Sequence, residues 1–118
     1  MKKLLFLFCG VIMFAASGCL PREGEVVLPE NAVLLDVRTP DEHKEGYLAG
    51  AVLIPLAELD SKLANSIPDK NTPVFIYCRS GRRSGIAVEK LKARGYSDVC
   101  NLGGLDDARK LLGVPVKK

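Results

Sequence analysis

The sequence predicts a single α/β domain with a mainly parallel, five-stranded sheet flanked by helices. Short apolar runs alternate along the chain with helix-like segments, which is typical of a parallel sheet covered by helices. The length of 118 residues leaves room for one domain. The apolar run Val74–Tyr77 leads straight into a cysteine, a glycine-containing loop and a helical stretch. A thiol is therefore expected where a parallel strand ends and a helix begins.

Each expected strand is a short run rich in apolar residues, and the five are Val26–Leu28, Ala32–Val37, Ala51–Ile54, Val74–Tyr77 and Ser97–Leu102. The first helix is expected to start at Thr39, which caps it, with Pro40 at its first position and a stop by Gly46. The other helices are expected over 56–67, 84–94 and 104–112, where Pro68 and Gly95 end the first two.

The first eighteen residues predict an export signal. A basic start precedes an apolar run of thirteen residues, Leu4 to Ala16, which is too short to span a bilayer comfortably. The stretch Ala16-Ser17-Gly18-Cys19 resembles the lipobox of bacterial lipoproteins, which implies lipidation at Cys19 and a periplasmic or cell-surface domain attached to the membrane. Plain export and an uncleaved anchor helix are the alternatives. The domain is expected over 19–118, with its core over about 25–112.

Charge and cysteine content narrow the function classes. The chain carries a net charge of +3, and loss of the two lysines in the signal leaves +1, so no basic field for nucleic acid remains. Of four cysteines, Cys9 and Cys19 fall in or beside the signal, which leaves Cys78 and Cys100 in the domain. Cys100 is expected to be a packing residue of a strand, with a disulfide to Cys78 as the alternative. One histidine and no CxxC pair argue against a metal site.

Cys78 is the candidate nucleophile. Backbone N–H groups and the dipole at a helix start favour negative charge, which lowers a thiol pKa and yields the reactive thiolate. Arg79, Arg82 and Arg83 add permanent positive charge, so the loop is predicted to cradle an anion. For each arginine the alternative is that it is a solvated surface residue without a role in binding, and this alternative is strongest for Arg82. Ser84 is expected to cap the next helix.

The order and spacing of several short motifs resemble the rhodanese-like domain. They are Leu35-Asp36-Val37-Arg38, Asp41-Glu42, Gly50-Ala51, the segment Cys78 to Ser84, and Gly103-Gly104. The resemblance covers about residues 25–112 and extends to small exported single-domain thiosulfate sulfurtransferases of the phage-shock type. The chain departs from the family pattern in the stretch before Ala51, and it lacks the Trp that often follows the Gly-Gly pair.

The resemblance implies a sulfurtransferase that needs no dissociable cofactor. Cys78 would take sulfane sulfur from a small anionic donor such as thiosulfate and pass it from a persulfide to cyanide or a thiol. The substrate-binding residues would be those of the loop, whose amides cradle the persulfide: Arg79, Ser80, Gly81, Arg82 and Arg83. A monomer is expected.

Asp36 and Arg38 end a predicted strand, where α/β sheets place their sites. They are expected to form a structural ion pair, and the alternative is that they orient the loop. His43 is expected to face solvent, and Phe75 and Tyr77 are expected to pack the strand.

Three rival functions stay open. Cysteine phosphatases have Arg six places after the cysteine, where this chain has Ser84, so the shorter loop ending at Arg83 fits sulfur better than phosphate. Arsenate reduction needs a resolving thiol, which only Cys100 could supply. A non-catalytic sulfur carrier or binding module belongs to another class, and an intact Cys78 is compatible with it.

Overall fold

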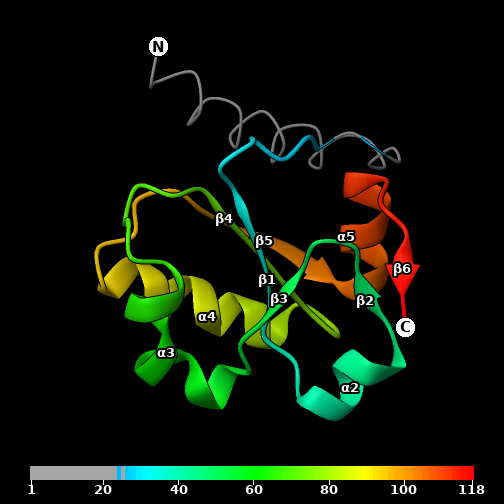
Figure 1. Ribbon diagram of the computed structural model, residues 1–118, viewed down its shortest axis with the longest axis horizontal. Coiled ribbons are helices and arrows are strands. Elements are labelled where there is room, and N and C mark those ends of the chain that lie inside the picture. The colour runs from blue at the N-terminus through cyan, green and yellow to red at the C-terminus, as the bar shows by residue number, and fades with distance from the viewer. Residues whose placement is uncertain (1–23, 25) are drawn as a thin grey trace.

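A computed structural model describes residue 24 and residues 26–118 (Figure 1). The expected signal segment and Cys19 lie outside the described residues. Within the described part of the chain, no helix has the length and apolar character needed to cross a membrane.

The centre of the domain is a four-stranded, fully parallel sheet in the order β3-β1-β4-β5. Its strands are β1 (Val33–Asp36), β3 (Val52–Leu53), β4 (Val74–Cys78) and β5 (Val99–Gly104). The α/β class and the parallel sheet are confirmed, but the expected count of five strands is wrong. Val26–Leu28 forms no strand, because Val26 N donates to Leu111 O at 2.8 Å and its side chain is buried beside the last helix.

The helices begin and end for local reasons. In α2 (Pro40–Glu45), Thr39 and Glu42 form a reciprocal capping box and Pro40 occupies the first turn. A 3₁₀ turn, η1 (Leu56–Glu58), leads into α3 (Leu59–Ser66), which ends before Pro68. The next helix, α4 (Arg82–Ala93), begins two residues earlier than expected, and α5 (Leu105–Leu112) follows β5 directly.

A second, two-stranded antiparallel sheet was not anticipated from the sequence. It pairs β2 (Tyr47–Leu48) with β6 (Val116–Lys117), so the C-terminus of the chain is tied to the segment that follows α2. Two-residue strands carry too little alternation to be recognised in a sequence. Their pairing depends on the tertiary fold.

The sheet divides the core into two layers. Side chains alternate along β4, so that Val74, Ile76 and Cys78 face the core under α3 and α4, whereas Phe75 and Tyr77 face the core under α5. Figure 1 shows α3 and α4 on one side of the sheet and α5 on the other. All four strands point the same way, so the ends of β1, β4 and β5 meet at one edge. The candidate site lies there.

Candidate active site

Cys78 is the last residue of β4, and its sulfur lies inside the turn that follows. This cysteine loop, residues 78–83, brings Gly81 N to 2.9 Å from Cys78 Sγ and Ser84 Oγ to 3.4 Å. Gly81 has φ +96°, a left-handed conformation that favours glycine, and it caps the start of α4 with its backbone. Burial alone would raise the pKa of the Cys78 thiol. Hydrogen bonding at the sulfur, which includes the backbone amides of Ser84, Gly81 and Ser80, outweighs burial, so the pKa lies below its ordinary value.

Gly103 and Gly104 form the surface against which the cysteine loop rests. A Cβ added to Gly104 would overlap the carbonyl oxygen of Arg79 and lie 3.1 Å from its carbonyl carbon. A Cβ added to Gly81 would lie 3.3 Å from Gly103 Cα, so the two backbones touch on both sides of the turn. Ser80 also makes an isolated antiparallel bridge to Gly104. The close approach of two backbones therefore explains Gly104, whereas Gly103 has φ +89°, a left-handed conformation that favours glycine.

Ser84 is not the helix cap that the sequence suggested. Its hydroxyl lies 3.0 Å from Gly81 O and 2.7 Å from Asn101 Oδ1, besides its contact with Cys78 Sγ. The N-cap residue of α4 is Gly81, which has no side chain to cap the helix. Ser84 therefore ties the sulfur to β5 rather than capping the helix.

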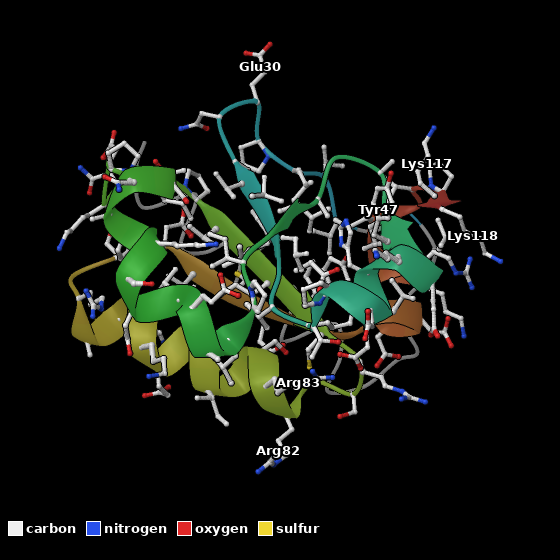
Figure 2. The ribbon with its side chains drawn as sticks, turned by 60° about the horizontal axis from the view of Figure 1, so that its bottom comes forward. Glu30, Tyr47, Arg82, Arg83, Lys117 and Lys118 are labelled. Atoms are coloured by element: carbon white, nitrogen blue, oxygen red, sulfur yellow. The ribbon has the colours of Figure 1, made fainter. Side chains whose placement is uncertain are left out.

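The three arginines occupy different environments. Arg83 forms a bidentate ion pair with Glu42 of α2, with Nη1–Oε1 and Nη2–Oε2 distances of 2.8 and 2.9 Å. The Arg83 hydrogen bonds lower the pKa of Glu42 to about 2. Arg82 is exposed and points out from the start of α4 in Figure 2. Arg79 is also exposed, and it lines a cavity beside the loop.

The cavity has a volume of about 550 Å³ and opens between α2, the cysteine loop and the start of α5. Gly104, which pairs with Cys78 across the sheet, is part of its wall. Two arginines and four carboxylates also line it: Arg38, Arg79, Glu42, Glu45, Asp106 and Asp107. A ligand in this cavity would lie next to the backbone that carries the sulfur.

Asp36 and Arg38 form a buried ion pair beside the site, as expected. Arg38 Nη2 lies 2.7 Å from Asp36 Oδ2, and the same guanidinium donates to Gly46 O at 2.6 Å. The Tyr77 hydroxyl donates to Asp36 at 3.0 Å and accepts from Leu48 N at 3.1 Å. This network links β1 and β4 to the segment after α2, and α2 in turn holds Arg83.

His43 is not the solvent-facing residue that the sequence suggested. Its Nδ1 lies 3.0 Å from Asp36 Oδ2, and its ring stacks on Tyr47 with centroids 4.2 Å apart. The pattern of charged residues at the start of α2 concealed this contact. His43 is the fourth residue of α2, and the helix places it beside Asp36 at the end of β1.

Cys100 is placed where it cannot resolve an oxidised Cys78 within the described fold. It pairs with Phe75 in the β4–β5 register and packs in the core under α5. Cys78 faces the opposite side of the sheet and lies three residues further along β4, about 10 Å away. Cystine needs Cα atoms within about 7 Å. An internal disulfide, and a reductase mechanism that uses Cys100 as the resolving thiol, would both require the strands to separate.

Sequence reasoning missed Asn101 and gave Glu42 no place in the site. Asn101 contacts Ser84, Gly81 and Gly103, while Glu42 binds Arg83. Asn101 could have been found by aligning the ends of β4 and β5, since Asn101 pairs with Ile76 close to the cysteine. Glu42 gave no comparable signal because a Glu in the first turn of a helix is explained by the dipole alone.

The fold and the loop define a class of protein. Residues 24–110 match the family described as the rhodanese-like domain, and the chain belongs to this family. Thiosulfate sulfurtransferase PspE of Escherichia coli (strain K12) is 45% identical over 73 residues, which cover 62% of this chain and 70% of that protein. A sulfurtransferase of Allochromatium vinosum is 38% identical over 87 residues, or 74% of this chain and 79% of that protein.

Solved structures agree with this family assignment. A structure described as a rhodanese with anions from E. coli superimposes with a TM-score of 0.67 at 40% identity, covering 74% of this chain and 98% of the other. A rhodanese-like domain protein from Staphylococcus aureus gives a TM-score of 0.60 at 30% identity and covers 93% of this chain and 95% of the other. Sulfur transfer is the general chemistry that these relatives support.

Proposed function

We propose that this protein is a thiosulfate sulfurtransferase that carries sulfane sulfur as a persulfide on Cys78. The observation that supports it best is the cysteine loop. A buried sulfur accepts a hydrogen bond from Gly81 N at 2.9 Å inside a turn of six residues, at the start of a helix. Such a turn stabilises negative charge on one or two sulfur atoms.

In the first half-reaction the Cys78 thiolate attacks the outer sulfur of thiosulfate. The new Sγ–S bond forms as the S–S bond of the donor breaks, and sulfite leaves with the bonding electron pair. Charge then rests on the outer sulfur of the persulfide. Donors fixed in the loop can stabilise this charge without reorganisation.

In the second half-reaction an acceptor attacks the outer sulfur. Cyanide gives thiocyanate, a thiolate gives a new persulfide, and the electron pair of the Sγ–S bond returns to Cys78. The two half-reactions share one enzyme intermediate, so ping-pong kinetics are expected. Neither step requires an oxidant or a cofactor.

Arg79 is the first candidate for attracting the anionic sulfur donor. Its side chain is exposed and borders the cavity next to the cysteine loop, and Arg82 adds exposed charge at the loop exit. Arg83 is already engaged by Glu42, so its main contribution is to hold the start of α4 against α2. Cys78 has no exposed surface at rest, so side chains at the mouth must move to admit the donor.

The decisive experiment is the intact mass of the purified protein before and after incubation with thiosulfate. One added sulfur atom, removed by cyanide with release of thiocyanate, is expected for wild type and Cys100→Ser. Cys78→Ser should gain no sulfur while keeping its circular dichroism spectrum.

Each rival function gives a different result. A sulfur carrier would load once but fail to turn over thiosulfate and cyanide repeatedly. A phosphatase would hydrolyse an aryl phosphate and acquire no sulfur. Loss of loading in folded Cys100→Ser as well as in Cys78→Ser would refute the single-thiol mechanism.

A further inference from the structure

The side chain of Asn101 connects three parts of the site. Its Oδ1 accepts from Gly103 N at 2.8 Å and lies 2.7 Å from Ser84 Oγ, while its Nδ2 donates to Gly81 O at 3.3 Å. A shift in the β4–β5 register places Leu102 as an extra residue between Asn101 and Gly103. Irregularities of this kind re-aim a neighbouring side chain. Here the carboxamide is aimed at the cysteine loop.

The orientation of this carboxamide is determined by its partners. Gly103 N can only donate, so the atom facing it must be the oxygen Oδ1. That oxygen is an acceptor towards Ser84 as well, and the distance of 2.7 Å is typical of an O–H···O hydrogen bond. The Ser84 hydroxyl is therefore the donor in this contact.

The other oxygen near Ser84 is already occupied. Gly81 O accepts from Gly85 N at 3.0 Å and from Asn101 Nδ2, and these two hydrogen bonds use both lone pairs of the carbonyl oxygen. The single hydroxyl proton of Ser84 therefore goes to Asn101. A lone pair of Ser84 Oγ then faces Cys78 Sγ, 3.4 Å away.

We propose that Asn101 is a positioning residue that holds the Ser84 hydroxyl proton, so that Ser84 accepts a hydrogen bond from the Cys78 thiol instead of donating one to the sulfur. Turning the hydroxyl towards an ionised sulfur would leave two oxygens 2.7 Å apart with no proton between them. The free thiolate thus relies on backbone amides such as Gly81 N.

This arrangement distinguishes the resting sulfur from the loaded one. In the persulfide the charge lies on the outer sulfur, which points into the loop and needs no donor at Ser84. Withholding the Ser84 proton therefore disfavours the free thiolate and leaves the persulfide unaffected. Asn101 would keep the resting cysteine protonated and favour the loaded state. The inference rests on Cys78 as the nucleophile of the proposed function, but its test reads thiol ionisation and not sulfur transfer.

Charged groups around the thiol come from one strand, three helices and the cysteine loop, and none of them changes in the variants used for the test. They are Asp36 at the end of β1, Glu42 of α2, Arg79 of the loop, Arg82 and Arg83 of α4, and Asp106 and Asp107 of α5. A change in thiol ionisation in these variants can thus be assigned to hydrogen bonding.

The test measures the alkylation rate of Cys78 by iodoacetamide against pH in the full chain, with the Cys78 peptide quantified by mass spectrometry. Asn101→Leu removes the acceptor and keeps the branched shape of the side chain, and the released Ser84 proton becomes available to the charged sulfur. We expect alkylation about threefold faster at acidic pH, equivalent to a drop of about half a pKa unit. The same substitution in a Ser84→Ala background should leave the rate unchanged.

The dependence on Ser84 separates positioning from a merely structural role. If Asn101→Leu unfolds the protein, Asn101→Ala serves instead, because it removes the carboxamide without adding bulk. In a folded variant, no shift, a shift to slower alkylation, or an equal shift with and without Ser84 would overturn the proposal. Failure of thiosulfate to load sulfur, with the alkylation pattern as expected, would count against the proposed function alone.

Discussion

Replacing Gly104 with alanine should impair sulfur transfer without unfolding the protein. The added Cβ would overlap the Arg79 carbonyl oxygen and press on Ser80 Cα at 3.3 Å, so the backbone next to Cys78 has to move. Gly104 itself has φ −80°, a conformation open to alanine, so the strain arises from contact and not from the backbone angle. The cysteine loop must shift by about half an ångström or more to restore van der Waals separation.

Displacements of about 1 Å can lower catalytic rates by about a hundredfold, so we expect kcat/KM of Gly104→Ala to fall about 10- to 100-fold. Gly85→Ala is the matched control. It lies in α4 near the same loop, and its added Cβ would only reach ordinary contact, 3.5 Å from Asn101 Nδ2. Alanine should stabilise that helix by up to about 1 kcal/mol and retain most activity.

The assay is the initial rate of thiocyanate formation from thiosulfate and cyanide, with urea unfolding of each variant as the stability control. Activity of Gly104→Ala close to that of wild type would refute the argument that the Gly-Gly pair determines the position of the loop. An equal loss of activity in both variants would show that the site tolerates no added methyl group near the loop, whatever its contacts.

Further predictions concern charge, stability and location. Arg79→Ala should raise KM for thiosulfate several-fold in steady-state assays. Arg83→Ala should mainly lower the free energy of unfolding, by about 1–2 kcal/mol, because it releases Glu42. Equal effects of the two substitutions on KM would contradict these separate roles. Asp36→Asn should cost about 3–5 kcal/mol in urea unfolding at neutral pH, since buried Arg38 loses its counter-charge. Burial acts to raise the pKa of Asp36, but hydrogen bonds from Arg38 and His43 lower it overall. The stabilisation by the ion pair is therefore present above the ordinary carboxyl pKa and is lost as pH falls through the lowered value. A stability difference between wild type and Asp36→Asn that persists in strong acid would argue against the ion pair. On cell fractionation, wild type is expected with membranes and Cys19→Ala in the soluble or unprocessed fraction, and identical behaviour would indicate plain export.

Most strands of the sheet could be predicted from the sequence, because they are short apolar runs and most of these runs end at glycine, proline or charged residues. It placed Cys78, Asp36 and Arg38 at strand ends, and the parallel sheet brings those ends to one edge. It also predicted five strands where the central sheet has four. Val26–Leu28 has the composition of a strand, but its backbone pairs with the end of α5. Composition cannot reveal that choice of partner.

The site was predictable as far as residues adjacent in the chain determine it. The cysteine loop is local, so its nucleophile and its amides could be inferred from twelve consecutive residues. Arg83–Glu42 and Ser84–Asn101 join residues 41 and 17 positions apart. These pairs form only once α2 and β5 are placed against the loop. For Arg83 this pairing offers a structural role beside the substrate contact that local charge suggested.

The placement of Cys78 and Cys100 on opposite faces of the sheet has a consequence for oxidative damage. A sulfenic acid formed on Cys78 is normally rescued when a nearby thiol condenses with it. Within the described residues the other cysteine is about 10 Å away on the opposite face of the sheet, so it cannot supply this thiol unless the strands separate, and we expect a second molecule that carries a thiol to do so. Recovery after peroxide treatment should thus track the concentration of added small thiols. Cells that keep this protein outside the cytoplasm would need to supply reductant there.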